Sequence, residues 1–128
     1  MPEFETFTRS MLPLRREPAV TLQRRGTISL NRPAFAALRS PSAVELLFDP
    51  DSRIIGLRGT DPRAENAHFV RSSTPAPSGP FIISAMAFFR VYGIDVPATR
   101  RFPAYVTDQV LCVELEGESQ PVRRGRTA

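Results

Sequence analysis

Short runs in which apolar and polar residues alternate, each ended by a turn signal, constrain the fold of this chain more than any other feature. In "AVTLQRRGTISL", Val20 and Leu22 share one face, and Ile28 and Leu30 share one face beyond the break at "RRG". A period of two is typical of a half-buried strand, so the stretch predicts two strands joined by a turn or bulge. "AVELLF" and "RIIGLR" alternate in the same way around "DPDS", and this sequence favours a type I turn in a hairpin.

One short helix is predicted between these two hairpins. Asn31 can cap its first turn. Ala34, Phe35 and Leu38 then form a narrow apolar stripe at helical spacing. The run "SPS" ends the helix, so residues 20–58 read β-β-α-β-β.

The second half of the chain repeats this order. "AHFVRSS" and "PFIIS" predict strands around the linker "STPAPSG", and the helix "AMAFFRVYG" precedes the hairpin "RFPAYV-TD-QVLCVEL". Ser84 can cap this helix and Gly93 can end it.

The two halves also match position by position. At one common offset Ile28 matches Ile82, Phe35 matches Phe89, and Leu38 matches Tyr92. We therefore expect an α+β fold built from two pseudo-repeated β-β-α-β-β units. The alternative is a chance similarity between the units of a small α+β domain.

These patterns divide the chain into three parts. Residues 1–18 contain three prolines and predict a mobile N-terminal arm. Residues 19–116 form one domain, made of the pseudo-repeats 19–59 and 67–116. Residues 117–128 lose all apolar periodicity and predict a disordered basic tail, whose arginines are Arg123, Arg124 and Arg126.

Composition indicates a soluble globular protein. A chain of 128 residues with 41% hydrophobic residues can bury a core without disulfides or metal. The longest apolar run, "FIISAMAFF", is about half of what a membrane span needs, and the start "MPEFETFTRS" does not resemble a secretory signal. One cysteine permits no intrachain disulfide, so we expect a cytoplasmic protein with no membrane partner.

The charged residues permit nucleic-acid binding. The chain has 17 basic and 13 acidic residues, a net charge of +4, and every basic residue is arginine. Arginine's planar fork suits phosphate, although GC-rich codons also account for a chain rich in Arg, Ala and Pro.

The first unit resembles the AbrB/SpoVT/MazE family of swapped-hairpin DNA-binding domains. The resemblance covers residues 19–59, and Gly26, Ile28, Leu30 and Leu38 fall at matching places. The chain departs from the family at Asn31, where the family usually has proline, and at Phe35, where it often has arginine. The sequence "SPSA" replaces the Gly-Asp turn that usually precedes the third strand.

The resemblance implies two units that interlock into one small barrel, and a DNA-binding transcriptional regulator. Because the second half can supply the partner unit, we expect a monomeric pseudodimer or a homodimer. The arginines that match the family's DNA-facing positions, with one nearby, are Arg24, Arg25, Arg32 and Arg39. The corresponding set in the second half is Arg90, Arg100 and Arg101, which does not align with the first set. The alternative is that these arginines only form a solvated surface.

A second function is a protein-interaction or structural assembly module on the same fold. The helix "AMAFFRVYG" carries Met86, Phe88, Phe89 and Tyr92, which either pack in the core or form a protein-binding surface.

Enzymatic chemistry has little support in this sequence. His68 is the only histidine and lies in a strand pattern, and Cys112 alternates with core residues. Asp49 and Asp51 fit a turn better than a metal pair, and no cluster has ligand spacing. We therefore expect no catalytic residues, cofactor or metal.

Overall fold

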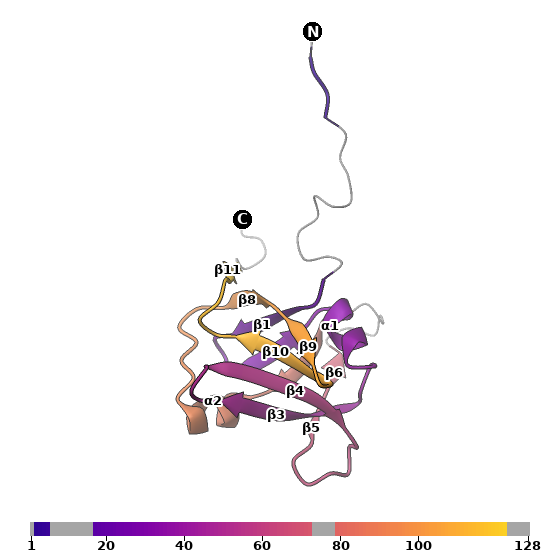
Figure 1. Ribbon diagram of the computed structural model, residues 1–128, viewed down its shortest axis with the longest axis vertical. Helices are drawn as coiled ribbons and strands as arrows, with labels where there is room; N and C mark the ends of the chain where they lie inside the picture. Colours follow the sequence, from indigo (N-terminus) through magenta and orange to yellow (C-terminus); the bar gives the residue numbers. More distant parts are fainter. Residues whose placement is uncertain (1, 6–16, 73–78, 123–128) are drawn as a thin grey trace.

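Strands form most of the regular secondary structure in the described part of this protein (Figure 1). The computed structural model describes residues 2–5, 17–72 and 79–122. These residues form two antiparallel sheets, which we call sheet A and sheet B. Across sheet A the order is β11 (Gln120–Pro121), β8 (Arg100–Pro103), β1 (Ala19–Gln23), β2 (Thr27–Leu30), β7 (Phe81–Ser84) and β6 (Arg71–Ser72). Across sheet B it is β5 (His68–Phe69), β3 (Ala43–Asp49), β4 (Ile54–Thr60), β10 (Val110–Glu114) and β9 (Tyr105–Thr107).

The first half has the element order that its sequence predicts. Strands β1 and β2 pair, α1 (Arg32–Ala37) follows, and β3 pairs with β4. The turn between β3 and β4 is the "DPDS" sequence, in which the Asp49 carboxylate accepts hydrogen bonds from the amides of Asp51 and Ser52. Aspartate at the first turn position explains both the turn and the register of the hairpin.

The second half follows the same order with two interruptions. Val70 separates β5 from β6, and Ala104 separates β8 from β9, while α2 (Met86–Tyr92) lies between β7 and β8. At each interruption the chain leaves one sheet and joins the other. Figure 1 shows α1 and α2 at opposite sides of the molecule.

The expected small barrel is not closed in the described residues, where the strands form two separate sheets. At the first interruption the Val70 amide donates to the Ser42 carbonyl, and at the second the Ala104 amide donates to the Pro18 carbonyl. Pro103 precedes the second interruption and has no amide hydrogen for a strand partner. The backbone at these corners therefore bonds to loop residues instead of continuing one ladder.

The core lies between the two sheets. Its fully buried members alternate along each strand, as the period of two predicts. Sheet A contributes Leu22, Ile28, Leu30 and Ile83, and sheet B contributes Ile55, Leu57, Leu111 and Val113. One face of each sheet is therefore buried against the other.

The predicted match of Ile28 with Ile82 is wrong. Ile28 pairs with Ile83 across β2 and β7, and both are fully buried, whereas Ile82 pairs with Ser29 and is half-buried. Successive side chains of a strand point to opposite faces, so an error of one residue reverses the face. Of the matched helix positions, Phe89 is buried in the core and Phe35 is partly buried against it.

The two helices begin differently. Asn31 caps α1 as predicted, because its side-chain Oδ1 accepts a hydrogen bond of 2.9 Å from the Ala34 amide. The predicted cap of α2 by Ser84 is wrong, because the N-cap is Ala85 and makes no side-chain hydrogen bond. Ser84 belongs to β7, where its hydroxyl accepts a hydrogen bond from the Arg71 guanidinium.

The two helices end in the same way. In each, one amide donates to the carbonyl three residues earlier, and the next amide donates to the carbonyl five residues earlier. The donors are Arg39 and Ser40 after α1, and Gly93 and Ile94 after α2. Arg39 has φ +65° and Gly93 has φ +63°, the left-handed conformation that glycine adopts most easily.

The predicted tail begins later than residue 117. Gln120 and Pro121 form β11, which pairs with Arg101 and Arg100 at the edge of sheet A. Most of the predicted arm and the end of the tail, residues 6–16 and 123–128, lie outside the described residues.

Candidate nucleic-acid interface

The turn between β1 and β2 presents the first two predicted arginines. Gly26 closes the turn with φ +99°, and its amide donates to the Gln23 carbonyl at 2.9 Å. A side chain at Gly26 would bring its Cβ to 2.9 Å from the Cβ of Met86. The Ala85 amide also donates to the Gly26 carbonyl at 2.9 Å, so the turn is fixed against the start of α2.

Arg24 and Arg25 are exposed and line a hollow of about 670 Å³. Residues 97–99 form its opposite wall, and the Arg24 amide donates to the Thr99 hydroxyl at 3.2 Å. No acidic residue lines this hollow within the described chain. This first hollow therefore presents two arginine side chains and no carboxylate.

Arg24 also lines a second hollow of about 420 Å³, formed with α2. Met86 and Arg90 of the helix face it, and Asp95 contributes one carboxylate. Arg90 therefore joins the arginines of the first half, although the sequence assigns it to the second set.

The other two predicted arginines lie at the far end of β2. Arg32 is the first residue of α1 and Arg39 follows its C-cap; both are exposed. Strand β2 has four residues at about 3.3 Å each, so the pair at 24–25 and the pair at 32–39 lie on the order of 15 Å apart. The structure thus gives two basic pairs at the two ends of one strand instead of a single cluster.

These four arginines are free of ion pairs within the described ranges. The two ion pairs found there join Arg58 to Glu45 at 2.6 Å and Arg63 to Asp61 at 3.3 Å. Exposed arginines without a carboxylate partner are available to an external anion.

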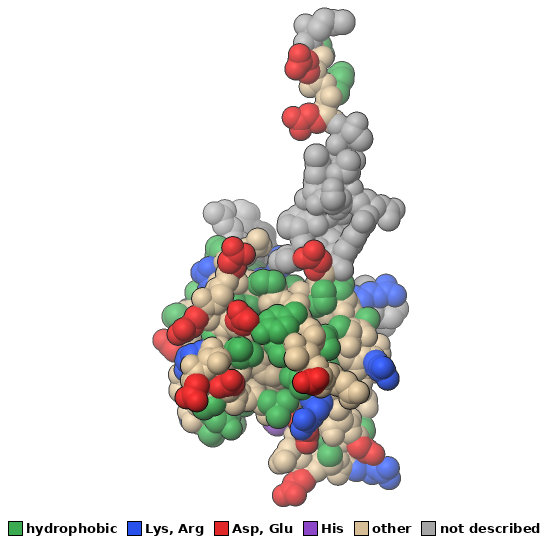
Figure 2. Space-filling model, in the orientation of Figure 1, with side chains coloured by type: hydrophobic (Ala, Val, Ile, Leu, Met, Phe, Trp, Pro, Cys, Tyr) green, Lys and Arg blue, Asp and Glu red, His purple; other side chains and the backbone are tan. Residues whose placement is uncertain are grey.

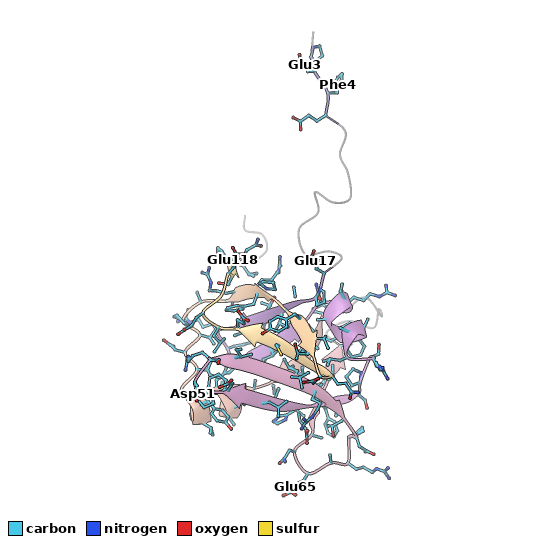
Figure 3. The ribbon with its side chains drawn as sticks, viewed as in Figure 1. Glu3, Phe4, Glu17, Asp51, Glu65 and Glu118 are labelled. Atoms are coloured by element: carbon cyan, nitrogen blue, oxygen red, sulfur yellow. The ribbon has the colours of Figure 1, made fainter. Side chains whose placement is uncertain are left out.

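The remaining second-half arginines do not form one surface with Arg90. The Arg100 side chain donates to the hydroxyl and the carbonyl of Ser119. Arg101 lines a hollow with Glu17 and Glu118, two carboxylates that lie at the same end of the molecule in Figure 3. The predicted set of Arg90, Arg100 and Arg101 is therefore divided.

Sequence reasoning missed two contributors to this interface. Met86 supports the turn through its contact with Gly26, and Thr99 holds the backbone of Arg24. The glycine after the arginine pair is the signal that could have indicated a close neighbour, because glycine often marks a close approach. Nothing in the sequence around Thr99 indicates its contact.

The residues considered for catalysis do not converge. His68 lies on β5 and Cys112 on β10, with β3 and β4 between them, a separation of roughly 14 Å at about 4.8 Å per strand. Burial raises the pKa of the Cys112 thiol, which keeps it protonated and a weak nucleophile. In the same described residues, no three side chains of His, Cys, Asp or Glu gather as they would around a metal ion.

A comparison with protein-family models, with curated proteins and with solved structures finds no match to this chain. Neither helix of the described part is long and apolar enough to cross a bilayer. Function is therefore argued from the site alone.

Proposed function

We propose that this protein is a small, non-enzymatic DNA-binding regulator of the AbrB-like type, built from two pseudo-equivalent halves. The observation that carries the proposal is the pair Arg24 and Arg25, exposed on a turn that is fixed against α2, beside a hollow with no carboxylate. The contacts with α2 fix the backbone of the turn, so little backbone freedom is lost when the two arginine side chains meet phosphates.

The positions of the helices support the proposal that the two halves are equivalent. The starts of α1 and α2, at Arg32 and Met86, differ by 54 residues, and so do the two pairs of amides that end them. The left-handed residues Arg39 and Gly93 share this offset.

The strands also support two equivalent halves, at an offset of 53 residues. Gly26 and Gly79 both have positive φ, and the buried pair Ile28 and Leu30 then corresponds to Phe81 and Ile83. One extra residue between β7 and α2 accounts for the change of offset.

The contacts between the halves support an interlocked arrangement. The turn before β2 packs on the start of α2, and the Phe81 ring at the start of β7 stacks on Phe35 of α1 with centroids 3.8 Å apart. Each half thus covers the helix of the other, as expected of swapped hairpins. The chain also passes from one sheet to the other at Val70 and at Ala104.

The spacing of the two arginine pairs suits a duplex. The major groove is about 12 Å wide, so pairs on the order of 15 Å apart can reach phosphates on its two sides. Figure 2 shows one face of the molecule, on which acidic side chains stand around a hydrophobic patch. Phosphates would be repelled there, which favours the arginine-bearing ends of β2 as the interface.

The overall charge adds a second contribution to affinity. All 13 acidic residues lie in the described part of the chain, together with 11 of the 17 arginines. The net charge of +4 therefore comes from segments 6–16 and 123–128, which carry six arginines and no acidic residue. These segments would increase non-specific attraction to DNA.

A salt titration of duplex binding tests this proposal. Fluorescence anisotropy of a labelled random-sequence duplex gives log K against log salt, with a slope of about −0.9 for each phosphate neutralised. The double variant Arg24→Gln, Arg25→Gln should make the slope less steep by about 1.8. The matched control Arg58→Gln, Arg63→Gln removes two arginine charges that are already paired with carboxylates, and it should leave the slope unchanged.

Three results would contradict the proposal or its interface. Absence of duplex binding at low salt contradicts DNA binding itself. Equal slope changes in both double variants contradict the assignment to the turn. An unchanged slope in both double variants would assign the DNA affinity to Arg123, Arg124 and Arg126, which lie outside the described residues.

A protein-interaction module is the second candidate, because α2 exposes large apolar side chains. Met86 is 53% exposed, Val91 75% and Tyr92 45%, whereas the predicted interaction residues Phe88 and Phe89 are buried in the core. Exposed aromatic and Met residues are enriched at protein interfaces. Loss of partner binding in a Val91→Ser variant that still binds DNA normally would assign α2 to a protein partner.

A further inference from the structure

The two ends of the paired strands β2 and β7 carry different basic elements. The strands are antiparallel, with Thr27 opposite Ser84 and Leu30 opposite Phe81. At each end of the pair, the first residue of one strand therefore lies opposite the last residue of the other. One end, the hairpin end, combines the turn of Arg24 and Arg25 with α2. The other, the helix end, carries α1 with Arg32 and Arg39.

Equivalent positions in the two halves carry different residues. At the offset of 54 that the helix caps share, Arg32 corresponds to Met86 and Arg39 to Gly93. At the same offset, Arg90 of the second half corresponds to Ala36 of the first half.

The turn of the first half also lacks a basic counterpart. At the offset of 53 shared by Gly26 and Gly79, Arg24 and Arg25 correspond in sequence to Pro77 and Ser78, which lie outside the described residues. All four arginines of the proposed interface therefore have non-basic equivalents, although Arg39 and Gly93 share the same backbone conformation and helix-ending hydrogen bonds.

We infer that one chain binds a DNA duplex whose two half-sites differ in sequence. The inference rests on the proposed DNA-binding function. A protein with exact two-fold symmetry presents the same side chains to both half-sites, so its preferred site is palindromic. In this chain the register of β2 with β7 and the helix ends repeat between the halves but the arginines do not, so the two half-sites meet different contacts.

The contacts at the two ends also differ in kind. At the hairpin end, Arg24 and Arg90 line one hollow with the half-exposed thioether of Met86, so guanidinium groups stand beside an apolar side chain. At the helix end, Arg32 begins the short α1 and Arg39 lies just beyond its C-cap. The hairpin end therefore suits two neighbouring bases in the major groove. A guanine would accept hydrogen bonds from a guanidinium group, and the methyl group of a thymine beside it would contact the apolar side chain.

The experiment selects duplexes from a random library with the full-length protein and weighs the complexes by native mass spectrometry. We expect a non-palindromic preferred sequence and one chain per duplex. The variant Arg24→Gln, Arg25→Gln should lose preference at one side of the site, and Arg32→Gln, Arg39→Gln at the other. Each loss should be about tenfold in affinity for the selected duplex.

A control variant and the possible outcomes distinguish failure of this inference from failure of the proposed DNA-binding function. Arg63→Gln, which removes an exposed arginine paired with Asp61, should leave the selected sequence unchanged. A palindromic sequence bound by two chains would overturn the inference and leave DNA binding standing, as would two double variants that affect the same base positions. Failure to retain any duplex, even at low salt, would overturn the proposed function itself.

Discussion

Arg39 adopts a backbone conformation in which glycine would be more stable. Its φ of +65° matches the φ of +63° at Gly93, and both residues donate the same hydrogen bond at the end of a helix. A left-handed conformation costs a non-glycine residue about 1–2 kcal/mol. Glycine loses roughly 0.5–1 kcal/mol more chain entropy on folding, so Arg39→Gly should stabilise the fold by about 0.5–1 kcal/mol.

The reverse change at the other helix should have the opposite effect. No atom lies within 4 Å of a Cβ built at Gly93, so Gly93→Ala meets the conformational cost without a clash. We expect it to destabilise the fold by about 1 kcal/mol. Arg39→Ala is the matched control, because it removes the guanidinium group and retains the strained backbone.

Thermal unfolding by circular dichroism measures the three variants. For a domain of this size about 1 kcal/mol corresponds to roughly 4 °C in Tm, so Arg39→Gly should raise Tm by about 2–4 °C and Gly93→Ala should lower it by about 4 °C. Arg39→Ala should change Tm by less than about 2 °C. In a duplex titration, both Arg39 variants should reduce the salt slope by about 0.9.

Two results would refute parts of this reasoning. If Arg39→Gly and Arg39→Ala have the same Tm, the left-handed backbone stores no strain that glycine relieves. If Arg39→Gly is more stable and binds DNA as well as the parent protein, Arg39 is not part of the interface. If the strain at Arg39 is retained because this residue binds DNA, Arg39→Gly should make the fold more stable and weaken DNA binding.

Three further experiments test the fold and the environment of Cys112. Asn31→Ala should cost about 1–2 kcal/mol because it removes a helix cap, whereas Ser84→Ala should cost less than about 0.5 kcal/mol; urea denaturation measures both. Ile28→Ala should cost about 2–5 kcal/mol and Ile82→Ala clearly less, and equal costs would contradict the register of β2 with β7. Alkylation of Cys112 at pH 8 should be slower than that of free cysteine, because its raised pKa leaves less thiolate; an equal rate in native protein would contradict this, and urea should remove the difference.

Local signals in the sequence predict local structure well in this chain. Asn31 and the "DPDS" turn were predictable because each is satisfied by hydrogen bonds to amides two or three residues away. Ser84 could not be assigned in the same way, because a serine before a helix can equally end a strand. Its pairing with Thr27, far away in the sequence, decides between the two.

The candidate site illustrates the same limit. Arg24 and Arg25 could be assigned to an exposed turn from the alternation on either side of them. That the turn packs on Met86, and that Arg90 shares a hollow with Arg24, depends on how the two halves meet. A pattern within one half contains no information on that contact.

Backbone amide NMR during titration with a duplex of about two helical turns tests the central claim most directly. The account predicts that the largest chemical-shift changes lie at residues 23–26, at 32–40 and along α2, and that the amides of β4 and β9 in sheet B change little. Changes confined to sheet B, or to the chain segments outside residues 17–122, would contradict the proposed interface.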